Sequence, residues 1–194
     1  MFTVLLDSSN TSLTVGLAKD DVLLESVSYE AWQSQSEHMI PELDKLLKKY
    51  HVERKDIKDV VVAIGPGSYT GVRIAITIAK TMATALGCDV YTISSLRCQK
   101  AGSSPSICVI NARSGRSYFG VFENDKIIVD DCIMTNDKVI EYINSHPDYV
   151  VCGNATYLGV NGQQPDIAKE LLDLKKCCSN VNDPLAIKPV YMKD

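Results

Sequence analysis

The most informative segment of the sequence is Gly65-Pro66-Gly67-Ser68-Tyr69-Thr70-Gly71-Val72-Arg73, called the glycine motif below. The apolar residues 59–64 before it predict a strand, and residues 72–86 after it predict a helix. A strand, a glycine turn and a helix N-terminus together place backbone N–H groups where an anion can bind. Three glycines in seven residues also indicate a sharp turn or a close approach to the backbone.

The spacing of the glycine motif matches neither of two common phosphate-binding patterns. A P-loop requires a Lys-Ser/Thr pair after its last glycine, whereas Val72 and Arg73 follow Gly71. The dinucleotide fingerprint is G-x-G-x-x-G, whereas this motif reads G-x-G-x-x-x-G. Two interpretations stay open: a ligand-binding loop, or a tight turn in which Ser68 caps the helix.

Composition sets the broad class of the protein. A chain of 194 residues, 45% hydrophobic and 23% charged, fits one large globular domain or two small lobes. The net charge of −4 does not favour a protein that binds nucleic acid by itself. No run of apolar residues is long enough to cross a membrane, and residues 2–6 read as a strand without a basic leader. We therefore expect a cytoplasmic protein with no membrane partner.

Residues that carry chemistry are few. The seven cysteines form no C-x-x-C pair and are expected to be reduced thiols that pack as small hydrophobes. The three histidines form neither H-x-x-x-H nor H-E-x-x-H. Asp7 ends the first predicted strand and could hold a metal through water above a phosphate-binding turn. Arg113, in a second polar loop, could bind a phosphate or an acidic partner, or lie in a solvated turn.

An internal repeat appears when 104 is added to each residue number. Asp7 then falls on Asn111 and Gly16 on Gly120, and no gap is needed over about 26 residues. Each predicted three-stranded meander is followed by a helix and then by an apolar strand closed by glycine. The sequence thus predicts two lobes of the same β-β-β-α-β plan, 1–101 and 102–194, with a boundary at 102–105.

The two predicted helices of the first lobe differ in character. The first, at 37–50, has a charged face and a capping box formed by Ser34 and Glu37. The second, at 72–86, has only two charges, Arg73 and Lys80, and its apolar surface exceeds the arc of about 100° needed to pack on one sheet. This surplus favours docking against another helix, the alternative being a helix sandwiched within its own domain.

In several segments the sequence resembles the bacterial TsaB family, also called YeaZ. Besides the glycine motif, the resemblance is carried by Leu6-Asp7-Ser8-Ser9, Gln35-Ser36-Glu37-His38, Asn111-Ala112-Arg113-Ser114-Gly115 and Pro189-Val190-Tyr191-Met192-Lys193. These segments follow one another in the expected order over the whole chain, and the glycine motif is quite specific.

The resemblance implies an α/β fold, namely a duplicated two-lobed actin-like ATPase (ASKHA) fold in which each lobe is a mixed β-sheet flanked by helices. It implies a non-catalytic scaffold or dimerization subunit of the complex that transfers a threonylcarbamoyl group to the adenosine next to the anticodon of tRNA. The expected partners are the catalytic subunit TsaD, the ATPase TsaE through the complex, and tRNA only indirectly. The same surface can also form a homodimer of the isolated protein.

In the catalytic relative, the strand after the glycine-motif helix leads into an H-x-x-x-H metal pair. Here Ser95 and Gln99 stand at those places, so the resemblance implies no metal, no catalytic residue and no protease activity. No cofactor is expected, unless a nucleotide binds in a degenerate cleft between the lobes. The alternative functions are an ATP-dependent phosphotransferase that relies on Asp7 and the glycine motif, or a nucleotide-sensing protein of the same superfamily.

Two sets of candidate site residues follow. Vestigial nucleotide or phosphate loops are expected at Asp7, Ser8, Gly65, Gly67, Ser68, Gly71 and Arg113. By analogy with the family, helices of the first lobe dock with the partner through Met39, Ile40, Leu43, Leu47, Arg73, Ile76, Thr77, Lys80, Ala83 and Thr84.

Overall fold

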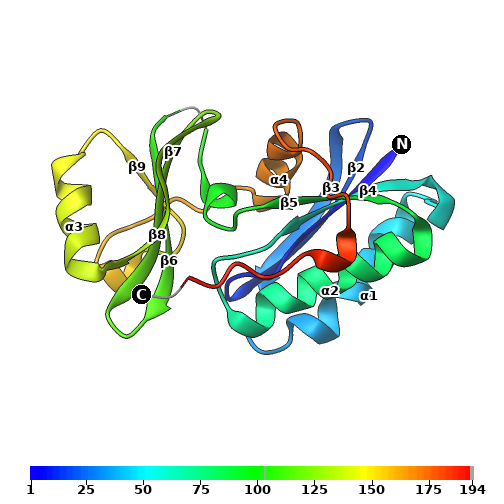
Figure 1. The fold of residues 1–194 in the computed structure, drawn as a ribbon, viewed down its shortest axis with the longest axis horizontal. Helices are drawn as coiled ribbons and strands as arrows, with labels where there is room; N and C mark the ends of the chain where they lie inside the picture. Colours follow the sequence, from blue (N-terminus) through cyan, green and yellow to red (C-terminus); the bar gives the residue numbers. More distant parts are fainter. Residues whose placement is uncertain (103, 193–194) are drawn as a thin grey trace.

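Two mixed β-sheets, each flanked by helices, form the two lobes of the protein (Figure 1). The computed structural model describes residues 1–102 and 104–192, so Ser103 of the expected boundary and Lys193 of the terminal motif lie outside the described residues. The first sheet has the order β3-β2-β1-β4-β5 and the second β8-β7-β6-β9. The strands are β1 (Phe2–Asp7), β2 (Ser12–Lys19), β3 (Val22–Glu30), β4 (Ile57–Ala63), β5 (Asp89–Ile93), β6 (Ser106–Arg113), β7 (Arg116–Glu123), β8 (Lys126–Thr135) and β9 (Val150–Cys152).

The duplication is visible in the pairing of the strands. In each lobe an antiparallel meander is completed by a parallel strand, β4 beside β1 in the first lobe and β9 beside β6 in the second. The two-lobed fold predicted from the repeat is therefore confirmed. The gapless alignment is wrong by one residue in the second hairpin, because Asp7 pairs with Thr14 whereas Asn111 pairs with Ser117. A register irregularity between Asn111 and Arg113 accounts for the shift.

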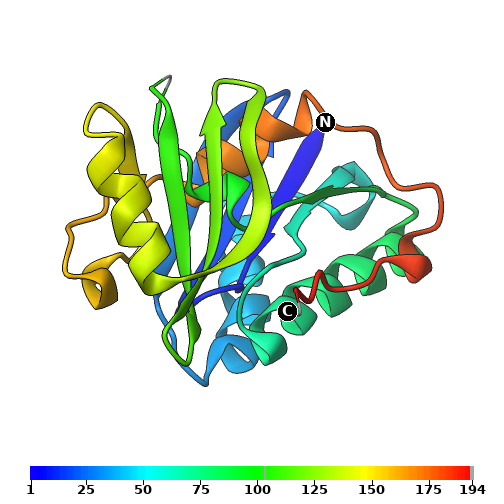
Figure 2. The same cartoon turned by 60° about the vertical axis from the view of Figure 1, so that its left-hand side comes forward.

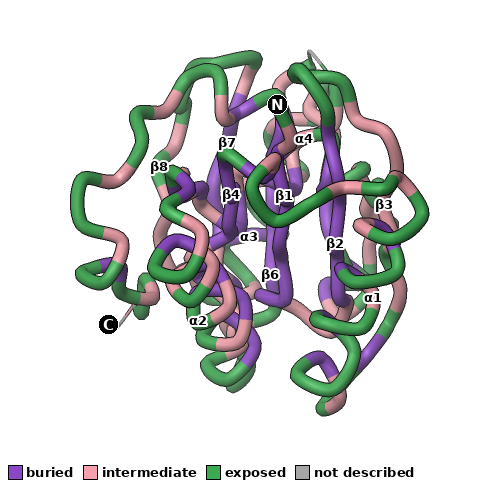
Figure 3. The backbone as a smooth tube through the Cα atoms, turned by 90° about the vertical axis from the view of Figure 1, so that its right-hand side faces the viewer, coloured by how far each residue is buried: buried purple, intermediate pink, exposed green. Residues whose placement is uncertain are grey.

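The first lobe has three layers. Helices α1 (Gln35–Lys49) and α2 (Tyr69–Leu86) cover one face of the sheet, where Val4, Val60 and Ala75 belong to one apolar core. Helix α4 (Ile167–Lys175) covers the other face with Ala168 and Leu171. Because both faces are covered, β1 and β4 are buried along nearly their whole length, as Figure 3 shows.

The second lobe is smaller. Helix α3 (Asn136–Ser145) packs Val139 on one face of its sheet, against Ile107 and Phe119. The other face, with Cys108 and Phe122, packs on Leu96 of the segment that joins the lobes. Short 3-10 helices occur at η1 (Arg54–Asp56), η2 (Arg97–Gln99), η3 (Thr156–Leu158) and η4 (Pro184–Ala186).

The chain returns to the first lobe after β9, so a second lobe of 102–194 does not correspond to one packed unit. Helix α4 is tied to the first sheet by a buried ion pair between Lys175 and Asp59, 2.6 Å apart. The C-terminal segment then runs along α2, as Figure 2 shows, and Val190 N–H donates to the Ile64 carbonyl at 2.8 Å. Sequence periodicity could not show this return, because it depends on which sheet face lacks a cover.

Two local predictions are refined. Helix α2 begins at Tyr69 rather than residue 72, because the cap lies within the glycine motif. The capping box at Ser34 is wrong: its side chain makes no cap hydrogen bond and donates instead to the Ala31 carbonyl at 3.2 Å. Over the described part of the chain, the helices are too short or too polar to traverse a bilayer.

Candidate functional site

The glycine motif caps helix α2 at its N-terminus. The Ser68 side chain accepts a hydrogen bond from Gly71 N–H at 3.2 Å, and the Ser68 carbonyl accepts one from Val72 N–H. This is the cap named in the tight-turn interpretation, one of the two that the sequence leaves open. The other end of the helix is closed by Gly87 at φ +66°, a left-handed conformation that glycine adopts without strain.

Glycine is required at three positions of the motif because backbone atoms from elsewhere in the protein occupy the place of a side chain. A Cβ atom on Gly71 would overlap the Ser8 carbonyl oxygen, and one on Gly67 would overlap the Ser9 carbonyl oxygen. At Gly65 (φ +106°) a Cβ would lie 2.7 Å from the carbonyl oxygen of Val190 in the C-terminal segment. The close approach predicted for the motif is thus made by the loop after β1 and by the C-terminus.

Asp7 and Ser8 are directed into the lobe. Ser8 is fully buried and its hydroxyl donates to the Gly71 carbonyl at 2.7 Å. The Asp7 carboxylate, 5% exposed, accepts a hydrogen bond from Ser9 N–H at 2.9 Å. Burial raises the pKa of the Asp7 carboxyl above its usual range, although hydrogen bonds from Ser9 and Ser8 oppose the rise. Asp7 therefore stabilises the loop after β1, and Ser8 joins this loop to the glycine motif.

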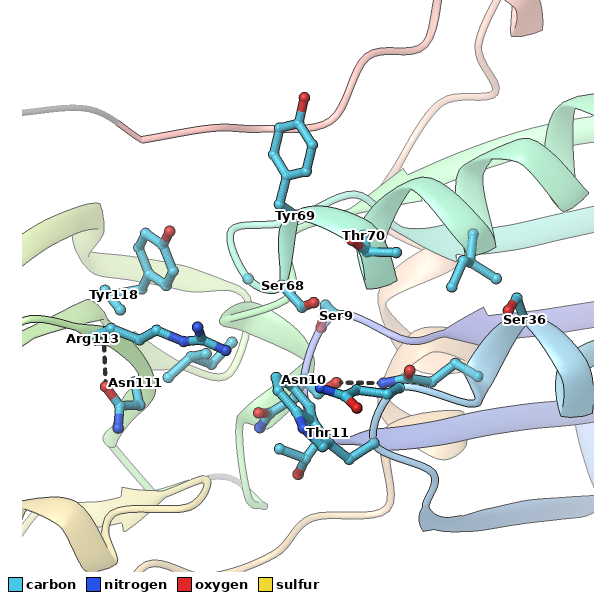
Figure 4. Close-up of a pocket in the computed structure, with 17 residues that line it drawn as sticks. Ser9, Asn10, Thr11, Ser36, Ser68, Tyr69, Thr70, Asn111, Arg113 and Tyr118 are labelled. Atoms are coloured by element: carbon cyan, nitrogen blue, oxygen red, sulfur yellow. Dashed lines mark hydrogen bonds between the residues drawn. The ribbon is translucent and has the colours of Figure 1, made fainter.

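A cleft of about 680 Å³ lies between the lobes (Figure 4). The first lobe contributes residues 9–11 after β1, residues around the start of α1, and residues 67–70 of the glycine motif. The second lobe contributes residues 110–113 and Tyr118. Figure 4 shows Arg113 extending toward the first lobe, while Tyr69 turns away from Ser9 and Asn10. The wall is mostly neutral and polar, with Arg113 as the single charged residue among those that line it.

Arg113 lines this cleft and contacts Trp32 on the other side. It is exposed and adopts φ +65°, and its guanidinium lies 5.6 Å from the centre of the Trp32 ring across the cleft. Its backbone N–H donates to the Asn111 side chain at 2.8 Å. Trp32 is 44% exposed, so this cation–π contact between the lobes is weak.

A nucleotide is the cofactor that the fold suggests, but the glycines leave no free space on the side where their side chains would stand. The space beside Gly67 and Gly71 is filled by the carbonyl oxygens of Ser9 and Ser8. Asp7, which would support a metal ion, is absent from the lining of the cleft. Of the expected vestigial residues, Gly67, Ser68 and Arg113 line the cleft, whereas Asp7, Ser8, Gly65 and Gly71 are used within the lobe.

The residues at the places of the metal pair also serve packing. Ser95, 1% exposed, accepts a hydrogen bond from Gly65 N–H at 2.9 Å, and Ser95 N–H donates to the Gly65 carbonyl. Gln99 is 4% exposed and lies beside Gly153. Within residues 1–102 and 104–192, histidine, cysteine, aspartate and glutamate side chains form no group of three or more that could hold a metal ion.

The expected docking residues divide into three groups. Met39, Leu43, Ile76 and Ala83 are buried in the core of the first lobe, so their expected place on a partner surface is not supported by their burial. Exposed are Ile40, Thr77 and Thr84. Leu47 is half-buried, and Arg73 and Lys80 hold the C-terminal segment: Arg73 Nε donates to the Tyr191 hydroxyl at 2.6 Å, and Lys80 Nζ to the Leu185 carbonyl at 2.8 Å.

Three further residues of α2, outside the expected docking set, lie partly at the surface. Ile74, Ile78 and Met82 are half-buried, and they recur at the four-residue spacing that places side chains on one stripe of a helix. All three pack against the core of the first lobe, and Ile74 also lines the cleft, as does Ser36 of α1. The spacing was visible in the sequence, but which stripe of an apolar helix stays at the surface depends on the sheet beneath it.

Comparison with known proteins places this architecture in a family. The family model for tRNA N6-adenosine threonylcarbamoyltransferase, TsaD, matches residues 28–158. The Bacillus subtilis protein described as tRNA threonylcarbamoyladenosine biosynthesis protein TsaB is 32% identical over 145 residues. That match covers 68% of this chain and 62% of the relative, so it spans less than two thirds of the relative's length. The Mycoplasma genitalium protein MG208 is 28% identical over 179 residues, covering 91% of this chain and 86% of the relative.

The fold agrees with these matches. The solved structure of YeaZ from Pseudomonas aeruginosa superposes with a TM-score of 0.83 at 21% identity, covering 98% of this chain and 99% of that one. At that identity the superposition shows the shared fold, while the sequence matches show the kinship. The chain belongs to the TsaB/YeaZ family.

Proposed function

We propose that this protein is a non-catalytic scaffold in the biosynthesis of threonylcarbamoyladenosine in tRNA, binding and stabilising the catalytic subunit TsaD. The family membership supports the pathway, because the Bacillus relative is described as a threonylcarbamoyladenosine biosynthesis protein. TsaE would reach this subunit through the complex, and tRNA would be contacted only indirectly. The same surface can also form a homodimer of the isolated protein.

The observation that supports the scaffold role most is what occupies the positions that would carry the chemistry, namely the places of the metal pair and the space beside the glycines. Ser95 fixes Gly65 through two hydrogen bonds, Gln99 is buried beside Gly153, and the carbonyl oxygens of Ser8 and Ser9 fill the space beside the glycines. An enzyme that activates an acyl donor needs a metal or another electrophilic group at such a place. Here each of these groups supports the fold, which favours a role in binding rather than in chemistry.

The surface of α1 and α2 supports a docking role. Ile40 is 50% exposed on α1, one turn after Ser36, and the half-buried Ile74, Ile78 and Met82 form a stripe on α2. Neighbouring apolar side chains on two adjacent helices are typical of helix-helix docking sites. The surface therefore fits a helical face of the catalytic subunit.

The direct test is the binding of purified TsaD by wild-type and Ile40→Asp proteins, measured by calorimetry and gel filtration. A charge on an exposed position leaves the fold intact but places a carboxylate in an apolar interface, so affinity should fall at least about tenfold. Ile128→Asp is the matched control, since Ile128 is 42% exposed on β8 of the other lobe. It should bind like the wild type.

Failure of the wild-type protein to bind TsaD, or to be required in a reconstituted tRNA modification reaction, would sink the scaffold role. The phosphotransferase and nucleotide-sensing alternatives gain no support from the contacts around the glycine motif. Calorimetry with Mg-ATP tests them: tight binding with turnover that is lost in Asp7→Ala would favour the enzyme.

A further inference from the structure

Exposed apolar and aromatic side chains gather along the C-terminal segment and the start of α2. We call residues 184–192 the C-terminal strap. Leu185 is 64% exposed, Tyr191 40% and Val190 36%, and the adjacent Tyr69 of α2 is 57% exposed. Large apolar side chains that cluster on a surface mark interaction sites more often than isolated ones do.

The strap is fixed along α2 at several points. Ile187 is 7% exposed and belongs to the core of the first lobe. Lys80 Nζ donates to the Leu185 carbonyl at 2.8 Å, and Val190 N–H donates to the Ile64 carbonyl at 2.8 Å. Figure 2 shows the strap running beside the helix toward its N-terminal end. The strap and α2 therefore present one continuous surface.

Tyr69, Tyr191 and Arg73 form a stack at the N-terminal end of α2. The rings of Tyr69 and Tyr191 lie 4.9 Å apart at an interplanar angle of 22°. The Arg73 guanidinium lies 3.9 Å from the centre of the Tyr69 ring, and its Nε donates to the Tyr191 hydroxyl at 2.6 Å. Tyrosine and arginine dominate the energetics of protein interfaces, and side chains already held in place lose less entropy on binding.

The charge of this surface is opposite to that of the whole chain. Helix α2 and the strap contain Arg73, Lys80 and Lys188 but no acidic residue, and Asp183, directly before the strap, accepts a hydrogen bond from Leu185 N–H; the whole chain carries a net charge of −4. Among the described residues none of these three cations has an ion pair. Arg73 and Lys80 donate to neutral oxygens, and Lys188 is exposed. Uncompensated cations favour a partner surface that carries carboxylates.

We propose that α2 and the C-terminal strap form one composite docking surface, and that it fits an apolar helical face of a protein partner bordered by acidic side chains. The proposal rests on the proposed function, in which that partner is the catalytic subunit. It adds that the strap is part of the interface. It also adds that Arg73 holds the Tyr69 and Tyr191 rings in place for binding.

The experiment compares two pairs of variants for binding to TsaD at low and high salt. Lys188→Glu reverses an exposed charge on the strap, and Lys138→Glu makes the same change on exposed Lys138 of α3. Leu185→Asp places a charge on the strap, and Ile127→Asp does so on Ile127, 51% exposed on β8. The strap variants should weaken binding about tenfold, with the Lys188→Glu effect shrinking at high salt, while the controls stay within about twofold.

The outcomes separate this inference from the scaffold role. If Ile40→Asp abolishes binding while Lys188→Glu and Leu185→Asp bind like the wild type, the strap is not part of the interface and the scaffold role stands. If wild type does not bind TsaD, the proposed function fails first. If Lys188→Glu leaves TsaD binding intact but weakens binding of tRNA to the assembled complex, the cations serve nucleic acid and the composite protein surface is overturned.

Discussion

The end of β1 and the end of β6 share one local hydrogen bond in different surroundings. Ser9 N–H donates to the Asp7 carboxylate at 2.9 Å, and Arg113 N–H donates to the Asn111 side chain at 2.8 Å. The first loop is buried under the glycine motif, whereas the second is exposed at the mouth of the cleft. Residues two apart set this bond, while tertiary packing decides whether it lies in a structural support or in a surface loop.

The strands that follow show the same contrast. β4 ends at Ala63 and is followed two residues later by Gly65, with φ +106°, and β9 ends at Cys152 and is followed by Gly153, with φ +94°. After Gly65 the chain enters the long helix α2, but after Gly153 it enters only the short η3. The two lobes thus share a plan up to this glycine, and the first lobe alone adds the helix that we propose as part of the docking surface.

The largest difference in stability between the two lobes is expected on replacing one glycine in each. Gly71→Ala should destabilise the protein by about 3 kcal/mol, because the added Cβ overlaps the Ser8 carbonyl and backbone must move. Gly115→Ala, in the second loop, meets nothing within 4 Å and has only its φ of +72° to strain, so about 1 kcal/mol is expected. Urea unfolding measures both. Equal losses would contradict the closed packing of the first loop.

A smaller effect on stability is expected when Asp7 and Asn111, the acceptors of the two hydrogen bonds, are each replaced by the other residue type. Asp7→Asn keeps an acceptor for Ser9 N–H and removes a buried charge, so the free energy of unfolding near neutral pH should rise. Since burial raises the pKa of Asp7 above 3.8, the ionised form is disfavoured in the fold. Its cost is absent below pH 3.8 and grows as the pH rises through the folded-state pKa.

The advantage of Asp7→Asn should therefore shrink as the pH falls from about 7 toward 4, which urea unfolding at several pH values measures. The reciprocal Asn111→Asp changes an exposed position and should alter stability little. An advantage of Asp7→Asn that grows toward acid pH would show that the carboxylate is stabilised, not disfavoured, in the fold.

The smallest effect is expected at the contact between the loops across the cleft. Arg113→Ala removes the guanidinium 5.6 Å from the exposed Trp32 ring and should cost less than about 0.5 kcal/mol. Trp32 fluorescence should report the loss of the contact, with Lys138→Ala as a remote control. A cost above about 2 kcal/mol would mean that the second loop, like the first, supports the fold.

Much of the fold was predictable because it depends on local periodicity. The alternating meanders, the apolar strand before the glycine motif and the Ser68 cap all have signals within a few residues. The one-residue shift at Asn111 was missed, because a bulge depends on small local forces. The helix was placed at 72–86, although a cap at Ser68 starts it at Tyr69. The docking residues remain a prediction: Ile76 and Ala83 are buried, while Ile74 and Ile78 are half-buried.

The sequence by itself determined the duplicated plan, the scarcity of catalytic side chains and the kinship to one family, because strand periodicity and motif spacing are encoded locally. The tertiary structure alone decided what the glycines are for. Carbonyl oxygens of Ser8, Ser9 and Val190, two of them about 60 residues before the motif and one more than 100 after it, occupy the space that the missing side chains leave. It also decided that the C-terminal strap covers one side of α2, since that contact joins residues far apart in the chain.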